Sequence, residues 1–393
     1  MSEIKQHWQK IELNEILSIS SKKFNPISNN ENKKCVELEH LSQETGKLLG
    51  YTNSSEQQSI KNSFEEGQIL FGKLRPYLKK FWKAEFEGVC SSEIWVMNGK
   101  KVKNDFLFYL VQTEKFNQIA NVSSGSKMPR ADWNYMSEIP FDIPPLKEQE
   151  KIAEILTTWD EAITKQTELL EAKELQKKAL MQKLLSGEVR FDGFSDKWKE
   201  VRIDKLFDFK KGQELSKEKL EKNGIFECIL YGELYTTYSE VISEIKSKTN
   251  IKEGIKSKID DILIPASTTT SAIDLAIAST IQKDNVLIGG DINILRKKTN
   301  NINGEFISKY LTHIKKMEIA KYAQGITIIH LYSKDFKHLK IQLPSLPEQQ
   351  KIAEVLSLAD DEINLLKNEL EELNLQKKAL KQKLLTGEVR VKV

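Results

Sequence analysis

The sequence predicts an α+β protein in which two mixed helix and sheet domains are joined by two long helices. The first observation behind this class is an internal repeat. Residues 143–190 align without a gap onto residues 343–390, and 27 of the 48 aligned positions are identical. The second observation is that both copies place apolar residues at helical spacing, whereas the preceding segments alternate short apolar runs with turns. We therefore expect the order domain, helix, domain, helix.

The repeat divides the 393 residues into four segments. We expect a first variable domain at residues 1–143, a first long helix at 144–190, a second variable domain at 191–343 and a second long helix at 344–393. Inside the variable domains the expected strands are 93–97, 261–264 and 291–295, and the expected short helices are 106–113 and 306–313.

Weaker matches extend the duplication into the variable domains. A tryptophan followed at fixed spacing by two aliphatic residues occurs at Trp8 and again at Trp198. Gly125 and Gly325 are also separated by the 200 residues that separate the two helices. The two domains are therefore expected to share a frame although most of their residues differ.

Composition limits the class of the protein. The chain has 39% hydrophobic and 30% charged residues, which suits two or three folded domains and excludes a disordered tail. Its 60 basic and 57 acidic residues give a net charge of +3, which excludes the strongly basic proteins whose composition alone indicates nucleic-acid binding. Three widely separated cysteines exclude a disulfide framework and are expected to be buried and reduced. No membrane span or secretory leader is indicated, so a cytoplasmic protein is expected.

Each copy of the repeat is expected to form one long amphipathic helix. The second copy carries a heptad seam interrupted only at Lys377, and the first copy has polar residues at Gln166, Lys173 and Lys177 of the same seam. The seam of the second copy consists of Ile352, Leu356, Ala359, Ile363, Leu366, Leu370, Leu373, Lys377, Leu380 and Leu384. At about 1.5 Å per residue each helix would be roughly 50 Å long.

The repeat also marks the ends of the helices. Proline is expected just before each helix because a helix does not extend through it toward the N-terminus. Glycine is expected just after each helix, in the left-handed conformation. These residues are Pro144, Pro145, Pro344 and Pro347 at the starts, and Gly187 and Gly387 at the ends. An isolated helix of this kind would expose its apolar seam, so we expect the two copies to pair antiparallel within one chain. A coiled coil between two chains is the alternative.

Sequence signatures of catalysis are absent from the chain. It contains no GxxxxGK[ST] phosphate loop, no GxGxxG motif after a strand and no [DNS]PP[YFW] tetrapeptide of the kind that amino-methyltransferases use. Its five histidines lack the spacing of metal ligands. We therefore expect a protein without catalytic residues or a bound metal, and a single-chain modification enzyme is disfavoured.

The first variable domain contains two candidate contact loops for nucleic acid. Basic and aromatic residues alternate between residues 73 and 82, where cations can meet phosphates and an arginine can reach base edges. A second loop, 123–130, combines glycine with two cations. The candidate DNA-binding residues of these loops are Lys73, Arg75, Tyr77, Lys79, Lys80, Lys127 and Arg130. A solvated basic face and an ordinary loop are the alternatives.

The second variable domain offers a weaker pattern. At the position equivalent to the basic cluster it has a run of hydroxyl residues, and after Gly325 it has a mostly apolar stretch. The candidate DNA-binding residues are Ser267, Thr268, Thr269, Thr327 and His330. A polar turn and the start of a strand are the alternatives.

The helical repeats carry a resemblance to a known family. Each opens with P-x-L-x-E-Q-x-K-I-A-E-[IV]-L and closes with L-L-x-G-E-V-R. In this order of parts, over the whole chain, the sequence resembles the specificity subunit of type I restriction-modification systems. The variable domains match that family only in their frame.

The resemblance implies a function for each segment. The variable domains would be target recognition domains, each reading one half of a bipartite sequence in double-stranded DNA, and the helices would form an antiparallel coiled coil that sets the spacer. Two methyltransferase subunits would dock on this frame and bind S-adenosylmethionine, so the chain itself needs no cofactor. Restriction or translocase subunits could join the complex. The alternative is a structural coiled-coil adaptor without sequence-specific DNA binding.

Overall fold

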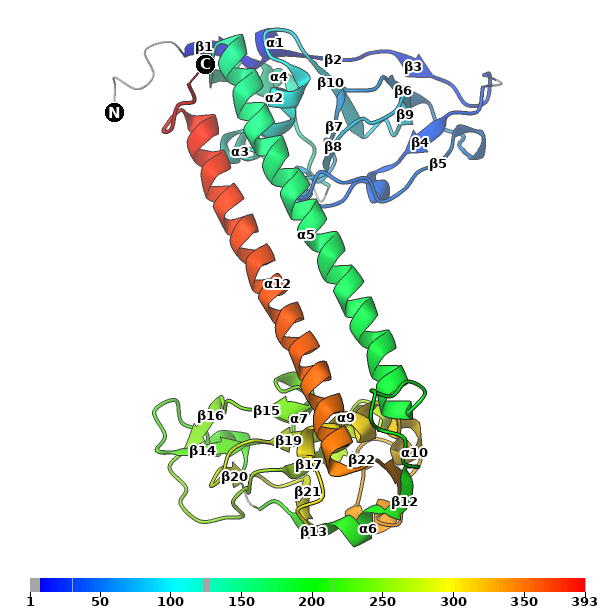
Figure 1. Cartoon of the computed structure of the whole chain (residues 1–393). Helices are drawn as coiled ribbons and strands as arrows, with labels where there is room; N and C mark the ends of the chain where they lie inside the picture. Colours follow the sequence, from blue (N-terminus) through cyan, green and yellow to red (C-terminus); the bar gives the residue numbers. More distant parts are fainter. Residues whose placement is uncertain (1–7, 30, 123–127, 214, 393) are drawn as a thin grey trace. The chain divides into compact units, whose positions relative to one another are not determined.

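The structure of the chain is a computed structural model that describes residues 8–29, 31–122, 128–213 and 215–392. The chain forms two compact units. The first unit extends to Glu168 and resumes at Asn368, and the second unit comprises Leu169–Lys367. Each unit holds one mixed domain and parts of both long helices, α5 (Leu146–Ser186) and α12 (Leu346–Thr386) (Figure 1). The predicted α+β class with two long helices is confirmed.

Within the described residues, the mixed domain of the first unit contains two larger sheets and the two-stranded sheet β1-β11. An antiparallel sheet has the strand order β2-β10-β7-β8, and a five-stranded sheet has the order β3-β6-β9-β4-β5. The elements are β1 (Gln9–Glu12), α1 (Leu13–Ile16), β2 (Leu17–Ile19), β3 (Lys23–Phe24), β4 (Lys34–Val36), β5 (Thr52–Asn53), β6 (Lys61–Phe64), β7 (Ile69–Gly72), β8 (Phe81–Lys83), β9 (Gly88–Cys90), β10 (Ile94–Gly99), α2 (Asn104–Leu110), α3 (Glu114–Ala120), α4 (Trp133–Ser137) and β11 (Pro140–Ile143). The strand expected at 93–97 and the helix expected at 106–113 are confirmed as β10 and α2.

The mixed domain of the second unit repeats part of this design. Its main sheet has the order β13-β21-β17-β19-β15, and a smaller sheet has the order β16-β14-β20. The elements are β12 (Lys199–Arg202), α6 (Ile203–Leu206), β13 (Phe207–Lys211), β14 (Phe226–Ile229), α7 (Glu233–Thr236), β15 (Val241–Ile242), β16 (Ser247–Thr249), β17 (Asp261–Pro265), β18 (Ser267–Thr268), α8 (Ala272–Leu275), β19 (Ser279–Ile281), β20 (Leu287–Ile288), β21 (Ile292–Lys297), α9 (Gly304–His313), α10 (Lys316–Ala320), β22 (Ile329–His330), α11 (Ser333–Phe336) and β23 (Lys340–Leu343). The expected strands 261–264 and 291–295 and the expected helix 306–313 are confirmed.

The central strands of each main sheet are apolar on both faces. In β7, Ile69 and Phe71 join one hydrophobic core, and Leu70 between them joins the other. In β17, Ile262 faces one core and Leu263 faces the other. Since alternate residues of a strand point to opposite faces, a sheet buried on both sides needs an uninterrupted apolar run. This is why these strands lack the polar alternation of a surface strand.

The two units share a frame of equivalent strands. In each, the strand that follows the repeated tryptophan pairs antiparallel with the strand that precedes a long helix: β1 with β11, and β12 with β23. The strand order β2-β10-β7-β8 corresponds to β13-β21-β17-β19. The predicted internal repeat therefore extends through the domains, although their peripheral sheets differ.

A buried glutamate at the start of each long helix fixes the domain to the helix pair. Glu148 accepts hydrogen bonds from Trp8 Nε1 at 3.1 Å and from Arg390 Nε at 2.6 Å. In the second unit Glu348 accepts the equivalent bonds from Trp198 Nε1 at 3.2 Å and from Arg190 Nε at 2.8 Å. The glutamate, tryptophan and arginine of the repeat motif thus form one contact, made once in each unit.

The next residue of the motif, a glutamine, anchors the same junction. Gln149 accepts a hydrogen bond from the Lys103 amide at 3.1 Å and donates to the Pro144 carbonyl at 2.9 Å. Gln349 makes the equivalent bonds to the Asn303 amide and the Pro344 carbonyl. The start of each helix is therefore tied to its domain by a side chain of the repeat motif.

The helix ends follow the sequence prediction with one correction. Gly187 (φ 75°) and Gly387 (φ 70°) follow the last residues of α5 and α12 in the left-handed region, as expected. Pro347 was expected to precede the second helix, and this was wrong, because it is the second residue of α12. Proline fits there since the amide it lacks would have no partner inside the first turn.

Within each unit α5 and α12 lie side by side and run in opposite directions (Figure 1). In the first unit Asp160 pairs with Lys377 and Gln166 donates to Glu369 at 2.9 Å. In the second unit the polar seam residues Lys173 and Lys177 form ion pairs with Glu362 and Asp360. In both units the residue number of the α12 partner falls as the residue number in α5 rises, so the predicted antiparallel pairing is confirmed. The polar interruptions of the seam meet acidic or amide partners on the opposite helix.

The cysteines are buried and free, as expected. Burial raises the pKa of Cys35 to about 12 and that of Cys228 to about 11, so both thiols stay protonated at neutral pH. Among the described residues, no helix is long and apolar enough to cross a membrane.

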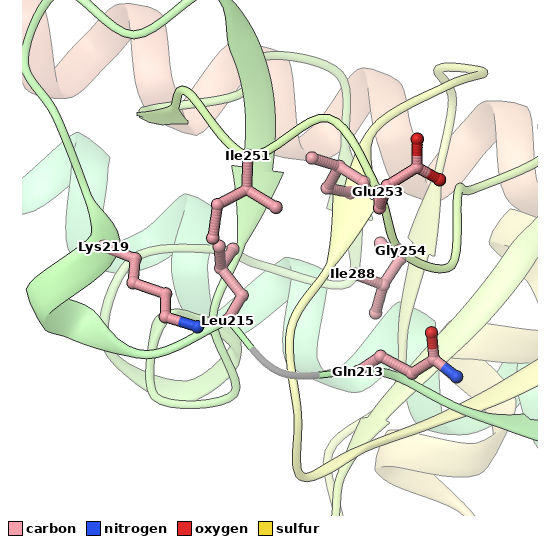
Figure 2. A pocket seen from close by; sticks show the side chains of 8 residues that line it. Gln213, Leu215, Lys219, Ile251, Glu253, Gly254 and Ile288 are labelled. Carbon is pink, nitrogen blue, oxygen red and sulfur yellow. The ribbon is translucent and has the colours of Figure 1, made fainter.

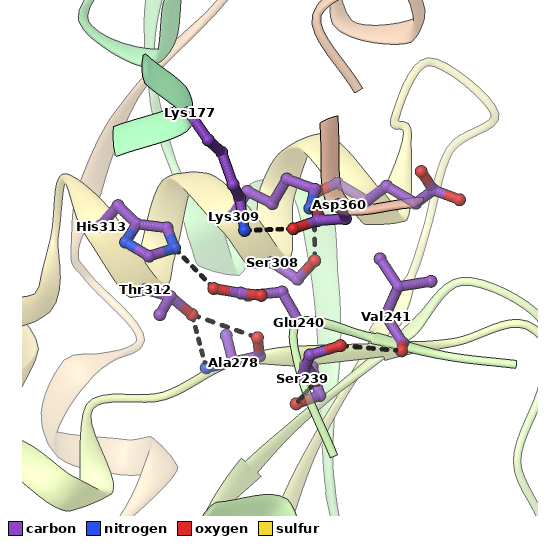
Figure 3. Close-up of polar contacts among 12 residues, drawn as sticks. Lys177, Ser239, Glu240, Val241, Ala278, Ser308, Lys309, Thr312, His313 and Asp360 are labelled. Carbon is purple, nitrogen blue, oxygen red and sulfur yellow. Dashed lines mark hydrogen bonds and ion pairs between the residues drawn. The ribbon is translucent and has the colours of Figure 1, made fainter. Parts of the chain in front are cut away.

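A group of charged side chains around the buried Lys309 ties α9 to α12 and to the start of β15 in the second unit (Figure 3). Lys309, which is 1% exposed, donates to Asp360 at 2.6 Å, and Glu240 lies 2.6 Å from His313 Nε2. Burial raises the pKa of Glu240, but the hydrogen bond with His313, a backbone hydrogen bond and nearby cations outweigh it and lower the pKa from 4.5 to about 2. The carboxylate is therefore more acidic in the folded chain than in the unfolded chain.

This shift predicts a pH dependence of stability. Because the folded pKa of Glu240 is depressed, its contribution of about 2–3 kcal/mol is complete above pH 4.5 and is lost as the pH falls toward 2. Glu240→Gln should lower the free energy of unfolding at pH 7 and remove this part of the acid loss. Urea unfolding between pH 3 and 7 tests the difference. Glu244→Gln, at an exposed residue, is the control. If the free energies of unfolding of wild type and Glu240→Gln fall in parallel as the pH is lowered, the prediction is contradicted.

Candidate nucleic-acid interface

The basic loop of the first domain connects β7 to β8 and has an unusual backbone. A 3-10 turn, Pro76–Leu78, is bracketed by Arg75 (φ 52°) and Lys79 (φ 47°), both in the left-handed region. A side chain with a Cβ is strained there by on the order of 1–3 kcal/mol. Such strain at two cations of one loop is typical of residues held in place for a contact.

The structure brings the two candidate loops of the first domain together. Leu74 and Arg130 form an antiparallel bridge, and the Arg75 amide donates to the Pro129 carbonyl at 2.8 Å. The Ala131 amide also donates to the Lys73 carbonyl at 2.9 Å. Residues 73–80 and 128–131 therefore form one surface, which we call the first-domain interface. Lys127, also predicted as a contact, lies outside the described residues.

The cations of the first-domain interface differ in how they are held. Arg130 is bound to Glu93 through two hydrogen bonds of 3.0 and 3.2 Å, and Lys79 donates to Glu44 at 2.8 Å. Lys80 donates to the Leu38 carbonyl at 2.6 Å, which fixes it within the fold.

Arg75 and Tyr77 project from the same surface without such restraints. Tyr77 is 53% exposed, and Arg75 is exposed as well. Within the described ranges, the side chains of Lys73 and Arg75 have no hydrogen-bond or ion-pair partner. Lys73, which is half-buried, and Arg75, which is exposed, could therefore bind a phosphate or a base edge without breaking an internal bond, and Arg75 is the more accessible of the two.

The second domain builds the same frame with different side chains. β18 (Ser267–Thr268) pairs with β22 (Ile329–His330). This pairing corresponds to the bridge between Leu74 and Arg130 in the first domain. The Leu331 amide donates to the Ala266 carbonyl at 2.9 Å, which corresponds to the bond from Ala131 to Lys73. We call residues 267–270 and 324–331 the second-domain interface. The two candidate segments of each domain are thus adjacent in both units.

The predicted residues of the second-domain interface are placed unequally. Ser267 and Thr268 are 5% and 3% exposed, and their hydroxyls bond to Asp291 and to Thr270. Their burial leaves little surface for a ligand. Thr269 and Thr327 are exposed. His330 is half-buried and stacks on Tyr332 with 5.6 Å between the ring centroids.

The apolar stretch after Gly325, a candidate segment in the sequence, forms a hairpin whose two exposed isoleucines were not among the predicted contact residues. The amides of Gln324 and His330 donate to each other's carbonyls at 2.8 and 2.7 Å and close the hairpin. Gly325 has φ 128°, and a Cβ there would lie 2.0 Å from the Ile328 carbonyl oxygen. Ile326 is 99% exposed at the tip and Ile328 is 51% exposed. Because apolar residues usually predict burial, no sequence signal would have identified these two as surface residues.

Two concave surfaces lie in the second domain. The larger, of about 620 Å³, is broadly open to solvent and is lined by polar and charged residues such as Lys256, Asp284 and Arg296. The smaller, shown in Figure 2, has a volume of about 160 Å³. It is lined by Gln213, Leu215, Lys219, Ile251, Glu253, Gly254, Leu287 and Ile288. This volume is below the roughly 300 Å³ at which ligand pockets begin. Across the ranges that the structure describes, no group of three or more histidine, cysteine or acidic side chains could hold a metal ion.

The fold and the paired interfaces define a class of protein, one built from two copies of a single module whose side chains differ. The family described as type I restriction modification DNA specificity domain matches residues 5–174 and 195–375. The chain belongs to this family and carries the domain twice. This membership supports the specificity-subunit reading over the coiled-coil adaptor.

Individual relatives agree with the assignment. The chain is 34% identical over 169 residues to the Escherichia coli type I restriction enzyme EcoDI specificity subunit, covering 42% of this chain and 38% of that protein. It is 25% identical to the putative MjaX specificity subunit of Methanocaldococcus jannaschii, covering 100% of this chain and 96% of that one. The S subunit structure from M. genitalium matches with a TM-score of 0.60 at 18% identity, over 96% of each chain. That structure supports the fold.

Proposed function

We propose that each mixed domain reads one half of a bipartite sequence in double-stranded DNA. The observation that carries this proposal is the pair of interfaces, built on equivalent backbone hydrogen bonds but with different side chains. A common frame suits two readers of one kind of ligand, and different side chains suit two different base sequences. The first-domain interface offers Arg75 and Tyr77, and the second offers Thr269, Thr327 and the exposed tip at Ile326.

The long helices suggest the remaining parts of the complex. Because 27 of their 48 aligned positions are identical while the domains differ, they are suited to bind two copies of one partner, which we propose to be methyltransferase subunits. Catalysis and S-adenosylmethionine binding would belong to those subunits, and this chain would be non-catalytic. Restriction or translocase subunits would complete a nuclease. The complex would act in the cytoplasm, where the host DNA lies.

A base-modification map of host DNA tests this function. Long-read sequencing would compare cells with and without this gene while a neighbouring methyltransferase gene stays intact. We expect methylation of one two-part motif to vanish when the gene is deleted. An unchanged map, with both proteins expressed, would reject the proposed function.

A substitution at Arg75 tests the first-domain interface separately. Arg75→Ala should weaken binding of the methyltransferase complex to its target by about tenfold, since one good arginine contact to a base contributes about 1–3 kcal/mol. The loss should be confined to one half-site, which binding to duplexes altered in either half would show. Lys10→Ala, an exposed lysine of β1, is the control. Equal affinities of wild type and Arg75→Ala at several salt concentrations would remove Arg75 from the interface.

A further inference from the structure

One position of the helical repeat holds an apolar residue in the first copy and a lysine in the second, although the fold does not require a lysine there. The segment L-Q-K-K-A-L-x-Q-K-L-L is shared by both helices, and the variable residue is Met181 in α5 and Lys381 in α12. Met181 packs against the apolar core of the second unit. Lys381 occupies the equivalent place in the first unit, partly buried, with its Nζ 3.0 Å from Gln112 Oε1. An apolar side chain would suit this position at least as well.

The surroundings of Lys381 are mainly cationic. The charges that act on it come from Lys377 and Lys378 of the same helix, from Lys79 of the first-domain interface and from Asp160 of α5. Burial and these lysines lower the pKa of Lys381 to about 8, and Asp160 only partly opposes them. The fold therefore holds this ammonium group at a cost in free energy.

The nearby carboxylates are already engaged. Asp160 is paired with Lys377 and also accepts a hydrogen bond from Tyr109 at 2.8 Å. Glu44 is the other acid close enough to interact with the charges of Lys378 and Lys381, and it is paired with Lys79 at 2.8 Å. In the part of the chain that the structure describes, Lys381 has no carboxylate partner. This cluster therefore has more positive than negative charges: four lysines, Lys79, Lys377, Lys378 and Lys381, against the two acids.

We propose that Lys381, together with the exposed Lys378 and beside the Glu44-paired Lys79, forms a phosphate-binding site on α12 that takes a backbone phosphate of the DNA beside the first half-site. This inference rests on the proposed function and deepens it. A bound phosphate would offset the desolvation of Lys381 and the repulsion among the lysines. Lysine suits this role because its ammonium group acts as a point charge on a flexible stem.

The position of the cluster favours DNA over other anions. Lys79 belongs to the same loop as Arg75, so the proposed phosphate site continues the first-domain interface onto the helix. Among the described residues the second unit lacks this cluster, because Met181 stands in place of the central lysine. The site would therefore strengthen binding at one half-site only and carry no sequence information.

The experiment uses the chain in its complex with methyltransferase subunits. Affinity for a duplex carrying the target is measured at salt concentrations between about 50 and 200 mM for wild type and Lys381→Met. Loss of one phosphate contact should reduce the slope of log affinity against log salt by about one. We expect affinity to fall about fivefold at the lowest salt and the methylated motif to stay the same. Lys183→Met, an exposed lysine of α5, should leave the slope unchanged.

The substitution is chosen to keep the chain folded, since methionine is the residue that the chain itself has at position 181. Thermal unfolding should show that Lys381→Met is at least as stable as wild type. A salt slope for Lys381→Met equal to that of wild type would overturn the proposal. If that equal slope came with weaker binding of the methyltransferase subunits, the ligand of the lysine cluster would be an acidic surface of those subunits and not DNA. If the wild-type complex fails to bind a two-part target, the proposed function itself fails, and this is seen before any variant is compared.

Discussion

Glu148→Ala is expected to destabilise the first unit by about 2–4 kcal/mol, the largest effect of a single substitution that we predict. The carboxylate is 2% exposed and accepts hydrogen bonds from Trp8 and from two nitrogens of Arg390. Alanine would leave the indole donor and the guanidinium without this acceptor. Removing one member of a buried pair usually costs about 3–5 kcal/mol, and the partial exposure of Arg390 reduces the expected value.

Urea unfolding followed by limited proteolysis would measure the loss and assign it to a unit. The transition of the first unit should move to lower urea, while that of the second unit stays in place. Glu348→Ala should do the reverse, since it breaks the equivalent contact with Arg190 and Trp198. Glu154→Ala, which removes an exposed pair with Lys151, should change stability by less than about 0.5 kcal/mol. Equal effects of Glu148→Ala and Glu154→Ala would contradict the prediction.

A four-residue insertion in both long helices is expected to lengthen the unread spacer of the DNA target by about two base pairs. Four helical residues add about 6 Å, and DNA rises about 34–36 Å over 10–10.5 base pairs. The insertions belong after Glu168 and after Lys367, where the helix segments of the two units meet. Since α5 and α12 run antiparallel, insertions at these two places keep the pairs on either side in register.

The methylated motif read by long-read sequencing is the measurement for this prediction. Both half-sites should keep their bases while the distance between them increases. An insertion in α5 alone is the control, because it shifts the register of one helix against the other and should abolish methylation. An unchanged spacer with both insertions present would show that the helices do not set it.

The parts of the fold that the sequence predicted well are those governed by local chemistry. The heptad seam predicted the long helices, and Gly187 and Gly387 predicted where they end, because both rules depend on neighbouring residues along one helix. Pro347 was misplaced because proline is also accepted inside a first turn. The role of Glu148 could not be predicted, since its partners Trp8 and Arg390 are far from it in the sequence.

The interfaces show where sequence reasoning stops. It found the segments that the fold brings together, because the cluster at 73–80 is dense in cations and the glycine loops recur 200 residues apart. It could not rank the residues within them. Arg75 and Lys80 look alike in the sequence, yet one is exposed and the other is fixed to a carbonyl of a distant loop. Ser267 has a suitable side chain for DNA but is buried by its pairing with His330.

The matched junctions have a consequence for how genes of this kind can change. Arg190 and Trp198 are joined by a short segment, whereas Arg390 and Trp8 are distant in the sequence, and yet both pairs meet their glutamate in the same way. The order in which the modules are encoded is therefore not fixed by the contacts between them. Recombination inside the repeated helix sequences would exchange one variable domain for another and keep the contact of glutamate, tryptophan and arginine at each junction. New target sequences could then arise in a single genetic event, without passing through a misfolded intermediate.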